Sequence, residues 1–221
     1  MGMQFQGMIR TLREAFNAST PEMVGLGPHS EMLVNQLFGK YYALTRRGLV
    51  YIHSTVVAGV AIPISTTTAP PFGVWNKSDS GKLLVPLLYS CAYVSGTAVQ
   101  TGIGISLLTG TGSNLATAAP LSAITEVAPR NALIGLGDAA RCVGFSATTL
   151  TAAATWLQSL GMNTFTGAAT VPVDISSPKV YDFEGMLQLP PGNLIHTVGN
   201  AASGALYGQT LIVAELPWTG I

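Results

Sequence analysis

Charged residues are scarce in this chain. Asp, Glu, Lys and Arg make up only 9% of its 221 residues, and ten basic residues balance ten acidic ones. A typical soluble domain carries roughly 25% charged residues. Few ionic groups leave much neutral surface, which is easily buried against partners. The composition therefore favours a protein that associates with other proteins. It argues against disorder, because 48% of the residues are hydrophobic and disordered chains are poor in apolar groups.

Clusters of basic residues are also lacking. Nucleic-acid binding by phosphate neutralisation needs Lys and Arg gathered on one surface. The densest basic stretch here is Arg46-Arg47, with Lys40 nearby. We therefore expect no direct nucleic-acid partner.

The chain has no uninterrupted apolar run of about 20 residues, the length that a membrane-spanning helix requires. Its longest stretch without charge, residues 83–125, is broken by Pro86, Gly96 and several Ser and Thr residues. The first residues, Met1 to Gln6, show no positive segment followed by an apolar one, which a secretory signal would need. We expect no membrane partner.

Residues that could carry chemistry are few and scattered. Cys91 and Cys142 each lie in an apolar stretch, a setting more typical of small buried residues than of a disulfide or metal site. His29, His53 and His196 are far apart in the sequence, and the last two fall within predicted strands. No Gly-x-Ser-x-Gly nucleophile motif accompanies them. The sequence predicts a protein that is not an enzyme and has no cofactor, metal or catalytic residues.

The first 40 residues show helical patterns. Ile9, Leu12 and Phe16 recur at helical spacing within residues 7–17, and a second helix is predicted over residues 31–38, ending at Leu37 and Phe38. Isolated helices this short are marginally stable in water, so their apolar faces must dock on a surface. That surface is either the chain's own β domain or a neighbouring subunit. In the second case these five apolar residues are the interface of a partly helical arm, residues 1–40.

From Lys40 onward the patterns are those of β-strands separated by turns. Residues 41–45 and 49–54 are predicted to form a hairpin around Arg46-Arg47-Gly48. A long strand is predicted over residues 82–94, with residues 99–108 returning beside it. The alternate residues on one predicted face of the long strand are Val85, Leu87, Tyr89, Cys91 and Tyr93.

Further strands are predicted over residues 143–150, 152–160, 180–184, 194–198 and 205–216. Many short strands punctuated by turns predict an all-β fold, a β-sandwich or jelly roll spanning residues 41–221.

Several passages together carry a resemblance. They are Tyr41 to Tyr51, Phe72-Gly-Val-Trp-Asn76 with Ser80-Gly-Lys-Leu83, Leu189-Pro-Pro-Gly-Asn193, and Gly208 to Pro217. Over residues 40–217 the chain resembles the jelly-roll cement, or decoration, proteins of tailed-bacteriophage heads. The resemblance implies a homotrimer on the capsid surface of the virion, with the major capsid protein and copies of itself as partners. Two alternatives stay open: a phage tail or fibre protein, which could bind a host receptor, and a shell-forming capsid subunit.

Overall fold

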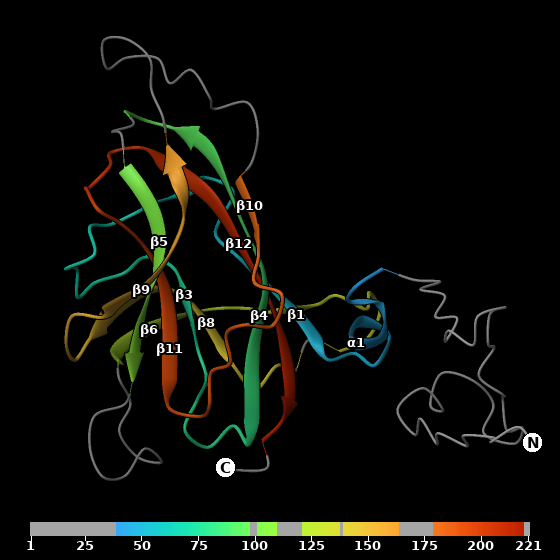
Figure 1. Ribbon diagram of the computed structural model, residues 1–221. Coiled ribbons are helices and arrows are strands. Elements are labelled where there is room, and N and C mark those ends of the chain that lie inside the picture. The colour runs from blue at the N-terminus through green and yellow to red at the C-terminus, as the bar shows by residue number, and fades with distance from the viewer. Residues whose placement is uncertain (1–38, 98–100, 110–120, 138, 164–178, 219–221) are drawn as a thin grey trace, which may run out of the picture.

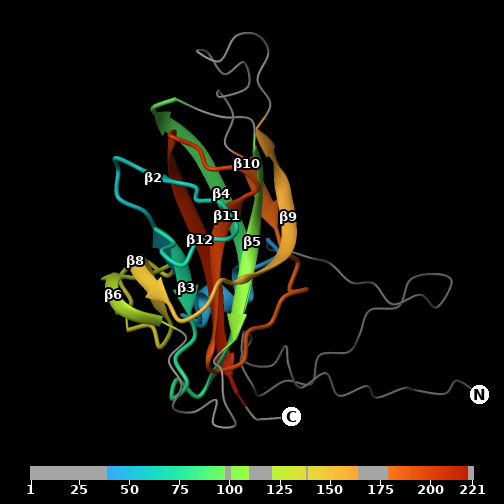
Figure 2. The same ribbon diagram turned by 90° about the vertical axis from the view of Figure 1, so that its left-hand side faces the viewer.

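The computed structural model describes residues 39–97, 101–109, 121–137, 139–163 and 179–218. The predicted arm helices, with Ile9, Leu12, Phe16, Leu37 and Phe38, lie outside these ranges. Within them the chain forms two antiparallel sheets that pack face to face (Figures 1 and 2).

The first sheet, called the β12 sheet, has the spatial order β10 (Lys179–Asp182), β4 (Lys82–Ser95), β12 (Leu206–Pro217), β1 (Val50–Ser54) and β7 (Arg130–Asn131). A short strand, β2 (Val60–Ala61), also pairs with β12. The second sheet, called the β11 sheet, has the order β6 (Leu121–Val127), β8 (Val143–Leu150), β3 (Gly73–Trp75), β11 (Asn193–Gly199), β5 (Thr101–Thr109) and β9 (Thr155–Asn163).

The strand order is that of a jelly roll, in which eight strands form two four-stranded sheets. One sheet contains β1-β12-β4-β10 and the other β3-β11-β5-β9, so the last strand lies between the first and the third of the eight. The pair β6 and β8 extends the second sheet beyond β3, and β7 extends the first beyond β1. The predicted all-β sandwich is confirmed.

Apolar residues from both sheets fill the space between them. Tyr89 and Val213 from the β12 sheet belong to the same buried cluster as Val74, Ile105 and Ile195 from the β11 sheet. This shared core fixes which face of each strand points inward and which points away from the sandwich.

No helix in the described ranges is long and apolar enough to span a membrane.

The predicted hairpin at residues 41–54 is wrong, because its first arm is a helix, α1 (Tyr42–Arg46). Tyr41 and Leu44, three residues apart, pack together against the outer face of the β12 sheet. The helix ends before Gly48, whose φ of +68° places it in the left-handed region common after helices. The segment therefore covers the sheet from outside instead of extending it.

The predicted return of residues 99–108 beside residues 82–94 is wrong, because β4 and β5 lie in different sheets and pair with other strands. The predicted faces of β4 are only partly correct. Tyr89, Cys91 and Tyr93 point between the sheets as expected, but Val85 and Leu87 belong to the cluster beneath α1 on the outer face. The pairing of β4 with β12 shifts between Leu88 and Pro86. A β-bulge at this point reverses the inward and outward alternation of the strand. Proline favours such a place because it has no N–H to donate to a ladder.

Candidate interface surfaces

The histidines and cysteines of the described ranges lie in the interior. His53 on β1 and His196 on β11 are buried, and this burial lowers the pKa of each imidazole to about 4. Cys91 and Cys142 are free and buried, which confirms the prediction for both. Burial raises the pKa of the Cys91 thiol to about 11 and that of Cys142 well above its ordinary value. Thiols held protonated in this way are poor nucleophiles at neutral pH.

Reactive side chains meet around Cys142. Its Sγ lies 3.5 Å from His53 Nε2. The backbone N–H groups of Arg141 and Cys142 donate to Glu215 Oε1 over 2.7 and 2.6 Å. A nucleophilic Cys–His pair needs a base that a third group orients, but His53 Nδ1 has no hydrogen-bond partner. The cluster therefore ties residues 141–142 to the buried end of β12, without the arrangement of a catalytic triad.

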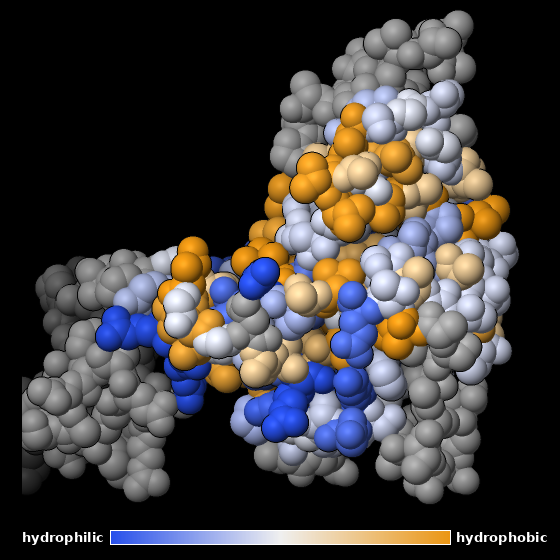
Figure 3. Space-filling view, turned by 180° about the vertical axis from the view of Figure 1, so that it is seen from behind, coloured by the Kyte–Doolittle hydropathy of each residue, from blue (hydrophilic) through white to orange (hydrophobic). Residues whose placement is uncertain are grey.

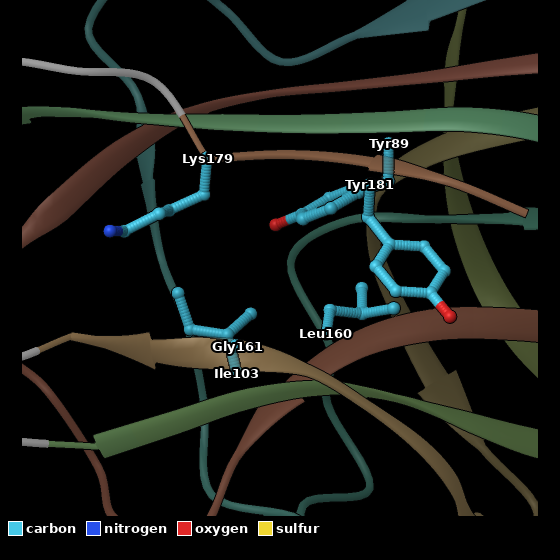
Figure 4. A pocket seen from close by; sticks show the side chains of 6 residues that line it. All are labelled: Tyr89, Ile103, Leu160, Gly161, Lys179 and Tyr181. Atoms are coloured by element: carbon cyan, nitrogen blue, oxygen red, sulfur yellow. The ribbon is translucent and has the colours of Figure 1, made fainter.

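A small cavity lies between the sheets near β9 and β10 (Figure 4). Its lining residues are Tyr89, Ile103, Leu160, Gly161, Lys179 and Tyr181. Its water-accessible volume is about 10 Å³, close to the minimum for one water molecule. The cavity is too small for a substrate. Within the described ranges, no three His, Cys, Asp or Glu side chains are grouped to hold a metal ion.

The described surface carries its charge unevenly. Residues 48–76, 83–97, 101–109 and 185–214 contain no Asp, Glu, Lys or Arg. In Figure 3 the upper part of the body is coloured mostly orange and pale, whereas the strongly hydrophilic residues gather lower down and on the projection that contains α1. On this face, charge is thus concentrated in the lower part of the body and on the projection.

The projection, called the α1 lobe, consists of α1 and the loop of residues 132–137. The Leu136 side chain fills the space beside Gly48, so the loop packs on the end of the helix. Ile134 at the tip of the loop is 96% exposed. Lys40, just before α1, donates to Asp182 at 3.0 Å and lies 3.2 Å from Glu184. This contact links the segment just before α1 to the end of β10.

A second surface, called the neutral face, is the outer side of the β12 sheet that begins at the edge of the part covered by α1, where Ile212 still contacts the cluster beneath the helix. Strand register places its residues in rows across neighbouring strands. The rows are Leu88, Ile212 and Ile52; then Val180, Ser90, Thr210 and Ser54; then Ala92 and Gly208, with Val94 close to Gly208; then Leu206 and Ala61. None of these residues is charged, and the one ionic side chain beside the first row, Asp182, is paired with Lys40.

The neutral face departs from the usual pattern of antiparallel sheets. A sheet with one face on the core normally presents polar residues to water on the other. Here the outward positions are aliphatic, small or hydroxyl-bearing, and Ser54 and Thr210 satisfy each other through a 3.0 Å hydrogen bond. Sequence reasoning did not identify this surface. Its signal is the absence of charge at every second position of β4 and β12.

Comparison of the chain with protein-family models, with curated proteins and with solved structures gives no match.

Proposed function

We propose that this protein is a structural component of a virus particle, a capsid cement protein of the kind found on tailed-bacteriophage heads. In this function it lies on the capsid surface and clamps neighbouring subunits of the major capsid protein, together with copies of itself. The neutral face carries the proposal, because a four-stranded sheet surface without charge is suited to burial against protein and poorly suited to water.

Two further features support this function. The jelly roll is an architecture that viral capsid proteins share with lectins and cupins, and the chain resembles phage cement proteins in the passages named above. The α1 lobe adds a second exposed apolar site at the point where residues 1–38 join the sandwich. A cement protein needs two kinds of contact, one with the shell and one with its own copies.

The energetics of a cement protein require little from each contact. A standard protein interface buries about 1,600 Å² in total. When many copies bind one shell, each contact is strengthened by the others, so modest interfaces suffice. Neutral surface is suited to such joints because its burial leaves no charge unpaired.

Mass spectrometry of purified virus particles from the source tests the function directly. We expect this chain in the particle at a copy number comparable to that of the major capsid protein. A few copies per particle would instead indicate a tail or fibre protein. Absence of the chain from purified particles would refute a structural function in the virion.

A shell-forming capsid subunit is the second candidate, and the eight-stranded jelly-roll order favours it. Electron microscopy of the purified chain separates the two functions. Closed shells formed by this chain alone would identify a capsid subunit. A cement protein forms small oligomers and binds only to shells that another protein has built.

A further inference from the structure

We propose that one buried water molecule is bound on the outer face of the β11 sheet, between Ser106 on β5 and His196 on β11. The site is separate from the neutral face, because it lies on the other sheet and inside the protein. It belongs to the folded chain itself and does not depend on the particle function above.

Buried polar atoms that lack a hydrogen-bond partner within the protein gather on this face. Ser106 Oγ, His196 Nε2 and Trp75 Nε1 are three of the five such side-chain atoms in the described part of the chain. Strand register sets Ser106 directly opposite His196, at a Cα separation of about 4.5–5.5 Å. Trp75 lies one row further along, opposite Leu194. Because each buried polar group without a partner destabilises the fold, neighbouring groups of this kind indicate a partner that they share.

Ser106 and His196 point away from the core between the sheets. Each follows a residue of that core, Ile105 and Ile195 respectively, and successive side chains of a strand point to opposite faces. The outer face of a sheet commonly meets water. Here, however, the exposed fractions of Ser106 and His196 are only 0% and 1%. Another part of the chain must therefore cover them.

The connection between β8 and β9 crosses this face. β8 lies beside β3 and β9 beside β5, on opposite sides of β11, and residues 151–154 join the two strands. Leu150, just before the crossing, and Ala154, within it, belong to the same buried cluster as Leu108 and Leu194. The outer face therefore has a small core of its own, from which bulk solvent is excluded.

His196 determines which kind of ligand the site takes. The ring is neutral at pH 7, because burial lowers its pKa to about 4. Its Nδ1 lies 3.3 Å from the carbonyl oxygen of Thr197, which can only accept, so Nδ1 carries the ring proton. Nε2 then has a lone pair and requires a donor. Ser106 Oγ can donate or accept, so a ligand that both donates and accepts satisfies the two side chains together.

The lack of charge around the site excludes ions. No Asp, Glu, Lys or Arg occurs in β3, β5, β8, β9 or β11, nor in the crossing residues 151–154. A buried cation would find no carboxylate on these elements, and a buried anion would face the lone pair of His196 Nε2 without a basic partner. A neutral molecule that donates and accepts remains, and the burial of both side chains requires it to be small. Water meets these conditions, and buried water molecules typically bond polar groups that are otherwise unsatisfied.

A crystal structure of the full-length chain tests the site directly. We expect one water molecule within about 2.7–3.2 Å of both His196 Nε2 and Ser106 Oγ. Nitrogen-15 NMR of the histidine rings should show the proton of His196 on Nδ1. A direct hydrogen bond between the two side chains, a different bound molecule, or a site without water would overturn the proposal. A ring proton on Nε2 would overturn it as well.

The stability of S106A provides an independent test. Removing a hydroxyl that holds a water molecule weakens the fold, whereas removing a buried hydroxyl without any partner leaves the fold unchanged or strengthens it. The matched control is S159A, because Ser159 on β9 is exposed. In urea unfolding we expect the folding equilibrium constant of S106A to fall about fivefold or more and that of S159A to stay within about twofold of the wild type. An S106A variant as stable as the wild type, or more stable, would contradict a bound water molecule at this site.

Discussion

Lowering the pH from 7 to 4 should destabilise the fold through its two buried histidines. His53 and His196 lie in the interior, and one ring nitrogen of each, Nδ1 and Nε2 respectively, has no hydrogen-bond partner. Burial disfavours the protonated imidazolium, so the pKa of each falls from 6.5 to about 4 in the folded protein. In the unfolded chain both imidazoles regain an ordinary pKa.

The direction and size of the effect follow from proton linkage. Between pH 6.5 and about 4 the unfolded chain binds protons that the folded protein excludes. The free energy of unfolding therefore decreases as the pH decreases through this window. Each histidine should cost roughly 3 kcal/mol once the pH reaches the folded pKa. Together they amount to about 6 kcal/mol, a large fraction of the 5–15 kcal/mol that stabilises a typical domain.

Urea unfolding followed by tryptophan fluorescence at pH 4.5 to 7.5 measures this dependence. In the middle of the window the free energy of unfolding should change by about 2.7 kcal/mol per pH unit in the wild type. It should change by about half of that in H53Q and in H196Q. The carboxylate of Asp182, whose pKa is lowered first by the hydroxyl of Tyr41, loses its contribution only below pH 3.8 and so lies outside this range. Equal stability at pH 7 and pH 4.5, or an unchanged slope in both variants, would refute the reasoning.

Three further results are expected. Deletion of residues 1–20 should abolish attachment to capsid shells in a co-sedimentation assay. Circular dichroism should show that the β domain is still folded. Undiminished attachment would contradict the proposed arm interface. Glu215→Ala should lower the free energy of unfolding by about 2–3 kcal/mol in urea titrations, because the N–H groups of Arg141 and Cys142 lose their buried acceptor. A loss below about 0.5 kcal/mol would contradict this role. Gly73→Ala should cost about 1–3 kcal/mol in the same assay, because its Cβ would overlap the Ile195 carbonyl oxygen. Wild-type stability would show that the neighbouring strands β3 and β11 can shift apart there.

The fold class could be predicted from the sequence because the long strands are marked locally. Alternation and turn residues identified β4, β5, β11 and β12, whose bounds differ from the expected ranges by at most two residues. The failures depend on contacts distant in sequence. Residues 42–46 become helical because Tyr41 and Leu44 reach the outer face of a sheet formed by much later strands. The faces of β4 reverse at a bulge whose position is defined only by pairing with β12.

The sequence predicted that the protein associates, but it did not locate the surface that we propose for the contact. Low charge indicated association, and an amphipathic arm was the segment that local periodicity could identify. No local sequence pattern identifies the neutral face. The alternation of side chains along a strand separates inward from outward residues, but it does not show whether the outward residues are exposed to water. Val180, Ser90 and Thr210 become one surface only when three strands from different parts of the chain are paired.

The polarity of β12 is the strongest physical reason to regard this surface as buried in the working protein. Its inward positions hold Gln209 and Glu215, both buried polar residues. Gln209 Oε1 accepts hydrogen bonds from Tyr89 and Thr197 at 3.1 and 2.6 Å. Its outward positions hold Leu206, Gly208, Thr210, Ile212 and Ala214. If the outer side of β12 faced water, burying the amide of Gln209 and the carboxylate of Glu215 inside would bring no gain in stability. Each buried polar group needs its own hydrogen-bond partners. The inverted arrangement is reasonable when both faces of the sheet are packed, the inner against the β11 sheet and the outer against α1 and, in the proposed function, against another protein.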